Sequence, residues 1–399
     1  MAFKFLDYGF DKDGAVASFR YEGDDGTVFE EKASFSKNDL VDFDEEILDS
    51  ALFFASVVIG TSYYKSHPTY EVILNKDIDN TQANIFNKIY QEGLSQFAFE
   101  NSLNRDNLAH FIGEGEGEIA RKSGAKDAAL ILVSGGKDSL LSAEKIRESG
   151  KEYKVAYISS SDSYPEIINE FGNPIIIRRY IDKEALKRAG GLNGHVPVTL
   201  INQVLSLIQA ILLGYNHIEF GIGREGLEPH AWIGDLPVNH QWSKTAEAQS
   251  LLKEYIYKYV ATDIEFGSVL EDKTELEIAE EFARLCWDKY GDKFSSCNIA
   301  NYKQDENNRD LKWCGRCAKC ANSYLLFAPF VKFERQKQIF GRDLFTDPEM
   351  TEIFKGLLGV DGVMKPFECI ASIDELRQAY VSRLPGYGEL PFVVPYPKE

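Results

Sequence analysis

The sequence is short of basic residues. Its 399 residues include 44 Lys and Arg against 63 Asp and Glu, which gives a formal net charge of −19. A chain with this balance repels a nucleic-acid backbone unless a local patch reverses the sign. We therefore expect no nucleic-acid partner.

Membrane-directed segments are also lacking. The first residues do not show the charged, then apolar, then small order of a secretory signal. The longest apolar stretch, residues 196–213, carries a polar stripe of Asn202, Gln203, Ser206 and Gln209, whereas a membrane span needs ~20 mostly apolar residues. We expect a buried helix here, no membrane partner and a cytoplasmic protein.

Cysteine is scarce, with six residues in the chain. Three of them nevertheless follow one another at Cys-x-x-Cys-x-x-Cys spacing, which in a cytosolic chain favours metal ligation over disulfides. A fourth cysteine would complete a closed tetrahedral shell suited to structural zinc, with no open position for catalysis. The alternative is free thiols in a packed subdomain. The candidate ligands are Cys297, Cys314, Cys317 and Cys320.

The first third of the chain predicts an α+β domain. Residues 1–35 alternate as strands do, and residues 24–26 form a hairpin turn between two of these strands. The apolar spacing over residues 45–60 and 81–96 is helical. We expect this domain to cover residues 1–125, up to a polar, Gly-containing junction.

The middle of the chain alternates strands with helices. This order predicts an α/β fold with a doubly wound parallel sheet over residues 126–270, in which ligands bind beyond the carboxyl ends of the strands. A helix over residues 139–148 follows the first of these strands and ends at Gly150. The strand candidates are residues 128–133, 153–158, 174–177 and 217–222.

The last third predicts a helical C-terminal subdomain over residues 271–399. A long helix near residues 274–289 opens it, and the cysteine cluster follows.

The glycine-rich turn after the first predicted parallel strand carries the strongest signal. It reads Ser-Gly-Gly-Lys-Asp-Ser between a buried strand and a helix, where successive N–H groups and the helix N-terminus form an anion-binding nest. Asp138 can hold a Mg²⁺ that bridges phosphate oxygens. The glycine-rich turn is not a Walker loop, because that motif needs Gly at position 131. The alternative is an ordinary tight turn. The candidate phosphate-binding residues are Ser134, Gly135, Gly136, Lys137, Asp138 and Ser139.

This turn resembles the pyrophosphate loop of the N-type ATP pyrophosphatases, which have an adenine nucleotide alpha hydrolase-like fold. The resemblance implies that ATP is split between its α and β phosphates and that AMP is placed on a carbonyl or carboxylate oxygen. The cysteine cluster looks like the zinc site of the 7-cyano-7-deazaguanine synthases. Those enzymes carry the same loop but are much shorter, and they lack a preceding domain.

Taken as an ordered set, seven blocks resemble one family, the ATP-dependent UDP-N-acetylmuramoyl-L-alanyl-L-glutamate epimerases (MurL). The resemblance covers nearly the whole chain, to about residue 370. It implies inversion of the terminal L-glutamate of a UDP-muramoyl dipeptide, a peptidoglycan precursor, to D-glutamate with conversion of ATP to AMP and pyrophosphate. The blocks are residues 24–26, 62–65, 134–139, 193–198, 238–244, 313–317 and 365–369.

The turn after the fourth predicted strand departs from the family pattern. It contains Arg224 and Glu225 where an Asn-Glu-containing turn is expected. Because strand ends face the ligand crevice in this architecture, we expect Arg224 to contact the nucleotide. The departure leaves open a relative that acts on another glutamyl or acyl peptide.

Epimerisation needs groups that move a proton. An α-proton beside a carboxylate is barely acidic, because its removal places a second negative charge next to the first. Adenylation neutralises the carboxylate, and a base within hydrogen-bond reach of Cα can then take the proton. Polar turns just before helices supply most candidates, although the same residues can serve as caps, and the cysteine can be a buried apolar residue. The candidates, in order, are His240, Lys244, His195 and Cys369.

Two other functions remain open at this point. A ligase or amidating enzyme of the same superfamily would let ammonia, an amine or a sulfur donor capture the adenylate. A zinc-stabilised nucleotide-binding regulator would bind ATP without turning it over. The oligomeric state is not predicted.

Overall fold

The computed structural model describes residues 2–117, 119–224, 226–301 and 309–383. Within them, a nine-stranded sheet has the order β11-β8-β5-β6-β7-β3-β2-β1-β4. The strands from β11 to β7 are parallel, and the meander β3-β2-β1 is antiparallel. The strands are β1 Phe3–Asp11, β2 Val16–Glu22, β3 Val28–Ser34, β4 Val72–Ile73, β5 Lys126–Leu132, β6 Glu152–Ser159, β7 Ile175–Tyr180, β8 Tyr215–Glu219 and β11 Glu265–Gly267.

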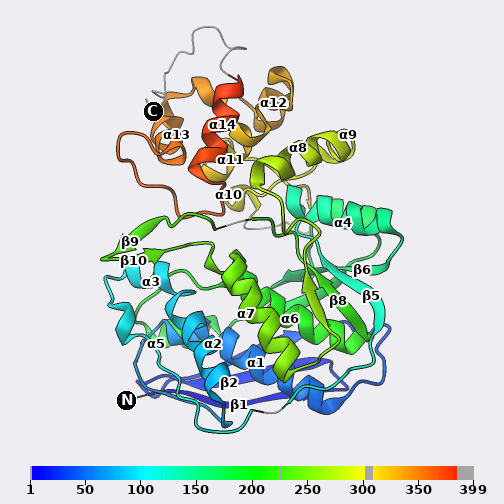
Figure 1. Cartoon of the computed structure of the whole chain (residues 1–399), viewed down its shortest axis with the longest axis vertical. Helices are drawn as coiled ribbons and strands as arrows, with labels where there is room; N and C mark the ends of the chain where they lie inside the picture. Colours follow the sequence, from blue (N-terminus) through cyan, green and yellow to red (C-terminus); the bar gives the residue numbers. More distant parts are fainter. Residues whose placement is uncertain (1, 118, 225, 302–308, 384–399) are drawn as a thin grey trace.

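Helices cover both faces of this sheet. Along β5, Ala128 and Leu130 belong to one hydrophobic core, and Ala129 and Ile131 belong to the other. A strand that is buried on both faces reads as a continuous apolar run, which is why this segment is recognisable in the sequence. The α/β class with a mostly parallel central sheet is therefore confirmed. On the first face lie α1 Glu45–Tyr64, α2 Asn80–Gln91, α3 Ser95–Glu100, α5 Lys183–Ala189, α6 Val198–Leu213 and α7 Ala246–Tyr259, and α4 Lys137–Ser149 covers the second (Figure 1).

The predicted helices and the hairpin are present with small changes. The turn at residues 24–26 joins β2 to β3, and α4 ends at Gly150. The helix predicted over residues 81–96 is interrupted, because α2 ends at Gln91 and α3 begins only at Ser95. A short hairpin of β9 Ala231–Ile233 and β10 Leu236–Val238 was not predicted.

Helix α1 is long and apolar enough, by length and composition, to cross a membrane. However, 89% of its most apolar window is buried inside the protein, where it packs against the sheet and α6. The core helix of a globular domain can have the same length and apolar composition as a membrane span.

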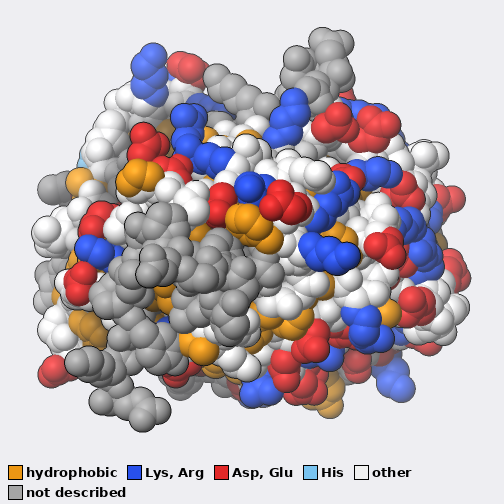
Figure 2. All heavy atoms as spheres, turned by 90° about the horizontal axis from the view of Figure 1, so that it is seen from above, with side chains coloured by type: hydrophobic (Ala, Val, Ile, Leu, Met, Phe, Trp, Pro, Cys, Tyr) orange, Lys and Arg blue, Asp and Glu red, His pale blue; other side chains and the backbone are white. Residues whose placement is uncertain are grey.

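Helices beyond residue 271 pack above the carboxyl edge of the parallel strands (Figure 1). They share one hydrophobic core with α4 and the second face of β5. The helix predicted over residues 274–289 is two helices, α8 and α9, which meet at Cys286. The helices beyond residue 271 are α8 Glu275–Leu285, α9 Trp287–Tyr290, α10 Asn298–Asn301, α11 Ala318–Phe327, α12 Phe333–Phe340, α13 Thr351–Leu358 and α14 Ile373–Arg383. Acidic and basic side chains are interspersed on the face seen from above (Figure 2).

The N-terminal meander is an extension of the parallel sheet. Strand β3 pairs with β7 in antiparallel fashion, with Ala33 opposite Arg179. The predicted boundary at residue 125 therefore divides two parts that share one sheet, and it stays a prediction.

A buried ion pair lies at this junction. Arg179 Nε donates to Glu31 Oε1 at 2.6 Å, and Glu31 is fully buried. Tyr63 and Ser62, both on α1, complete the network through bonds of 2.8 Å to Glu31 and Arg179. Burial works against the charged form of Arg179, but Glu31 raises the pKa of Arg179 above its ordinary value. The pair thus fixes α1 and the meander to the parallel strands.

We expect Arg179→Met to lower the free energy of unfolding by ~3–5 kcal/mol, because it leaves a buried carboxylate without its partner. Arg20→Met, which breaks an exposed pair with Asp7 on the same sheet, is the control and should cost less than ~1 kcal/mol. Urea unfolding curves measure both losses, and equal losses would contradict a role for the buried pair.

Candidate active site

The glycine turn between β5 and α4 has the conformation that an anion-binding loop needs. Gly135 has a φ of +89°, and a Cβ at this position would lie 2.4 Å from Leu311 Cδ1. Gly136 is the N-cap of α4. Ser139 Oγ accepts from the Ser134 N–H at 3.2 Å and donates to the Gly136 carbonyl at 3.0 Å. The turn is therefore held by its own side chains and directs the helix N-terminus outward.

Lys137 is buried at the start of α4 between two carboxylates. Its Nζ lies 2.5 Å from Asp138 Oδ1 and 2.6 Å from Glu275 Oε2. Burial alone would lower the pKa of Lys137, but the two carboxylates hold this pKa above its ordinary value. Glu275 comes from the first turn of α8, so the C-terminal helices contribute to the loop. Sequence reasoning missed Glu275, because its only signal is the Thr274 cap one residue before it.

A pocket of about 180 Å³ opens beside this turn, beyond the carboxyl ends of β5, β6 and β8. Its walls are mostly apolar, and its polar groups come from the glycine turn, from α6 and from Lys244. Neither Thr199 nor Asn202 was predicted as a site residue. Thr199 ends the polar turn that the sequence predicts before this helix, and Asn202 belongs to a polar stripe that has many explanations on a buried helix. The pocket is lined by Leu132, Val133, Ser134, Ser139, Ala156, Tyr157, Ile158, Thr199, Asn202, Phe220, Gly221, Ile222 and Lys244.

Arg224 does not line this pocket. It follows β8 as expected, but its side chain is exposed and its Nε donates to the Asp272 carbonyl at 2.8 Å. Its backbone N–H donates to the Lys273 carbonyl. Arg224 thus secures the segment before α8, while its neighbour Glu225 lies outside the described residues.

Three histidines gather between the sheet and the C-terminal helices. The ring centroids of His195 and His240 are 4.4 Å apart, and those of His230 and His240 are 5.9 Å apart. Burial lowers the pKa of His195 and His230 to about 3 and the pKa of His240 to about 4. Lys65 and Lys365 lower the pKa of His195 and His230 further, whereas Glu368 partly offsets the effect of burial on the pKa of His240. All three rings are therefore neutral at pH 7. His230 follows the divergent turn at Arg224 in the sequence, and the sequence analysis assigned it no role.

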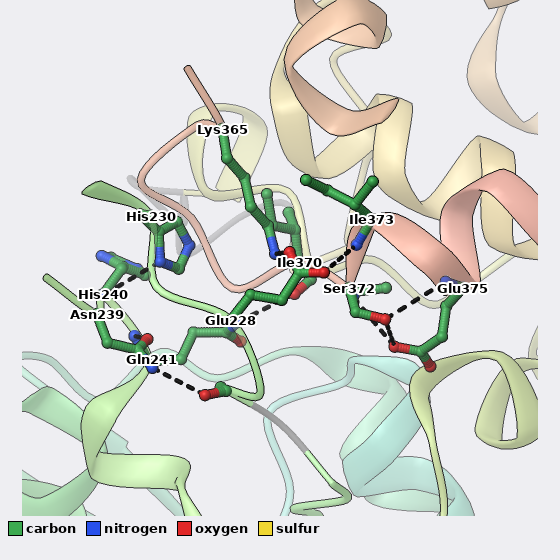
Figure 3. Close-up of polar contacts among 12 residues, drawn as sticks. Glu228, His230, Asn239, His240, Gln241, Lys365, Ile370, Ser372, Ile373 and Glu375 are labelled. Carbon is green, nitrogen blue, oxygen red and sulfur yellow. Dashed lines mark hydrogen bonds and ion pairs between the residues drawn. The ribbon is translucent and has the colours of Figure 1, made fainter. Parts of the chain in front are cut away.

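The loop of residues 365–373 runs beside His230, which bonds to the Glu368 carbonyl (Figure 3). Glu228 anchors it at both ends, because its carboxylate accepts from Lys365 Nζ and from the Ile373 N–H, each at 2.8 Å. Gln241 Nε2 donates to the Ile370 carbonyl at 2.9 Å. Cys369 lies on this loop and is half-buried.

The structure therefore divides the predicted proton-transfer residues between two places. His195 and His240 are in contact, Cys369 lies on the adjoining loop, and Lys244 lies in the pocket beside the glycine turn. Residues 240–244 connect the two places directly through a single short turn that ends in the 3-10 helix Trp242–Lys244.

The four predicted cysteines come together in the C-terminal subdomain. Their sulfur atoms all lie within 4.8 Å of one another, and the Cys297–Cys317, Cys314–Cys320 and Cys317–Cys320 separations are 3.7, 3.7 and 3.5 Å. A tetrahedral zinc with bonds of ~2.3 Å would place its sulfurs about 3.8 Å apart. The four thiolates thus fit structural zinc.

This cluster is connected to the glycine turn. The Ser295 N–H, two residues before Cys297, donates to the Gly135 carbonyl at 3.2 Å. Ser295 Oγ in turn donates to the Lys312 carbonyl at 2.8 Å. The segment before Cys297 is therefore bonded both to the glycine turn and to the segment before Cys314.

Comparison with known proteins agrees with this arrangement. The MurL N-terminal domain matches residues 1–269, and the MurL C-terminal domain matches residues 293–386. The chain belongs to the MurL family. The N-terminal match spans the meander and the parallel strands as one unit, as the shared sheet does.

Three relatives of this family carry the name UDP-N-acetyl-alpha-D-muramoyl-L-alanyl-L-glutamate epimerase. The protein from Xanthomonas oryzae pv. oryzae is 32% identical over 94% of this chain and 84% of its own. The Salinispora tropica protein is 33% identical over 94% and 83%, and the Micromonospora protein is 35% identical over 80% and 71%.

We expect the purified protein to contain about one equivalent of zinc, because one tetrahedral thiolate site holds one ion. Cys317→Ser should lose the metal. Cys286→Ser, which changes a buried cysteine outside the cluster, should keep it. Elemental analysis decides, and less than half an equivalent in the parent protein would contradict the site.

Proposed function

We propose that this protein is an ATP-dependent epimerase that inverts the terminal L-glutamate of UDP-N-acetylmuramoyl-L-alanyl-L-glutamate, a peptidoglycan precursor, in the cytoplasm. The observation that carries the proposal is the direct connection, through residues 240–244, between the pocket beside the glycine turn and a cluster of neutral imidazoles. The names of the three family relatives support the identity of the substrate.

The pocket suits the adenosine part of ATP. Apolar side chains such as Tyr157, Ile158 and Phe220 can pack against a purine, and Thr199 and Asn202 offer hydrogen bonds. The glycine turn and the N-terminus of α4 would then hold the phosphates. Asp138, half-buried at the head of α4, is the residue that would hold Mg²⁺, which neutralises phosphate charge when bound.

The chemistry has two stages. The substrate carboxylate attacks the α-phosphorus of ATP, the bond to the β-phosphate breaks, and pyrophosphate leaves. The resulting acyl-adenylate carries no carboxylate charge, so the α-proton becomes acidic and the electron pair moves into the carbonyl. Proton return from the opposite face inverts the centre, and water releases AMP and the D-glutamyl product.

The geometry limits which groups can act on opposite faces of Cα. Two such groups, each ~3–3.5 Å from the carbon, would be separated by about 6–7 Å with the carbon between them. His195 and His240 are in ring contact, so no carbon fits between them. We infer that this pair serves one face and that Lys244 or Cys369 serves the other.

The decisive experiment is incubation with ATP, Mg²⁺ and the UDP-muramoyl dipeptide in deuterated water. We expect D-glutamate with deuterium at Cα and stoichiometric AMP, because the returning proton comes from a group that exchanges with solvent. AMP without inversion would contradict the epimerase. An amidated or thiolated product would instead indicate a ligase of the same superfamily.

We expect Asp138→Asn to weaken binding of Mg²⁺-ATP by about 10-fold or more, since it removes a charged ligand of the cation. Asp127→Asn is a matched control, because Asp127 is exposed at the start of β5 and pairs with Lys151. Calorimetry measures both affinities. Equal affinities in the two variants would remove Asp138 from the nucleotide site.

A further inference from the structure

A short chain of hydrogen bonds runs from α3 to His240. Glu100 Oε1 accepts from Gln96 Nε2 at 2.7 Å, and Gln96 Oε1 lies 2.6 Å from His240 Nδ1. Gln96 is buried, and Glu100 lies one helical turn further along α3. None of these contacts involves a residue that the sequence identified, apart from His240 itself.

The chemistry of the donors fixes where the protons lie. An ionised carboxylate only accepts, so the amide nitrogen of Gln96 must face Glu100. The amide oxygen then faces His240, and because this oxygen also only accepts, His240 Nδ1 must carry the proton. In the neutral ring, Nε2 is left with a lone pair. Among the residues that the structure describes, none is bonded to this Nε2.

A second contact holds the backbone of His240. The His240 N–H donates to His230 Nδ1 at 3.4 Å, and His230 Nε2 donates to the Glu368 carbonyl at 3.2 Å. Both nitrogens of His230 are thus engaged by backbone groups. His230 therefore links His240 to the 365–373 loop and is not available to move a proton.

The surroundings of His240 favour its neutral form, chiefly through burial. Burial is the largest effect, and Lys319 and Lys244 lower its pKa further, whereas Glu368 and Glu100 raise it. The rings of His195 and His230 also face it. With a pKa of about 4, His240 is a neutral proton acceptor at pH 7.

We propose that Gln96, itself oriented by Glu100, is a positioning residue that holds His240 in the Nδ1–H tautomer, so that Nε2 is the proton acceptor for the substrate Cα. This inference depends on the proposed function only for the identity of the substrate. The Cα–H bond breaks, its electron pair enters the adenylated carboxyl group, and the proton passes to Nε2. His240 becomes an imidazolium that later returns this proton to solvent.

The tautomer can be measured without substrate. In ¹⁵N-histidine-labelled protein, assigned by loss of a signal in His240→Asn, we expect a protonated Nδ1 and an unprotonated Nε2 at pH 7. Gln96→Met keeps the length of the side chain without the accepting oxygen, and it should shift His240 toward the other tautomer. Gln82→Met is the control. It removes a buried amide from α2 that donates to Tyr255, and it should leave the His240 signals unchanged.

Activity provides the second readout. We expect Gln96→Met to slow deuterium incorporation at Cα by about 10–100-fold, while pyrophosphate release in the first turnover, which precedes proton transfer, stays near the parent rate. Glu100→Gln should give a smaller effect in the same direction, because it frees the Gln96 amide to rotate, and it serves if Gln96→Met does not fold.

An unprotonated Nδ1 in the parent protein would overturn the proposal, as would an unchanged tautomer and exchange rate in both variants. A different result would contradict the proposed substrate and leave the role of Gln96 unchanged. If the parent protein forms no D-glutamyl product but shows the Nδ1–H tautomer and its loss in Gln96→Met, the positioning role stands and the proposed substrate is wrong.

Discussion

The closure of the C-terminal helices on the glycine turn is the contact on which the rest of the structure depends. Leu311 fills the space beside Gly135, the Ser295 N–H binds the Gly135 carbonyl, and Glu275 pairs with Lys137. A helix N-terminus alone offers only partial charge to an anion. Here the turn that presents it is braced by the C-terminal segments, whose helices share one hydrophobic core with α4.

The same closure brings the 365–373 loop against the histidine cluster, where the Glu368 carbonyl binds His230. His240 belongs to the segment between the parallel strands β8 and β11, whereas the 365–373 loop comes from the C-terminal part of the chain and is anchored by Glu228. Since residues 240–244 reach from the cluster to the pocket, a group activated at the nucleotide would lie next to the imidazoles. A single closed interface thus serves both stages of the proposed reaction.

Local features of the site were predictable from the sequence. The glycine turn can be recognised in the sequence because a strand that is buried on both faces precedes it and a helix follows it. The cysteine cluster can be recognised from the spacing of its cysteines. The one-sheet connection of the meander was not predictable, because it depends on the pairing of β3 with β7 across more than a hundred residues. The roles of Gln96, His230 and Glu275 were hidden for the same reason, since each depends on a partner distant in sequence. Arg224 follows β8 as predicted, but its side chain binds the Asp272 carbonyl and does not line the pocket, so its contact with the nucleotide stays a prediction.

The fate of the nucleotide tests the central claim most directly. ³¹P spectroscopy of the products formed from Mg²⁺-ATP and the muramoyl dipeptide should show AMP and inorganic pyrophosphate in equal amounts. ADP and orthophosphate would place the cleavage between the β and γ phosphates, and an acyl-adenylate formed at the glycine turn would then be contradicted.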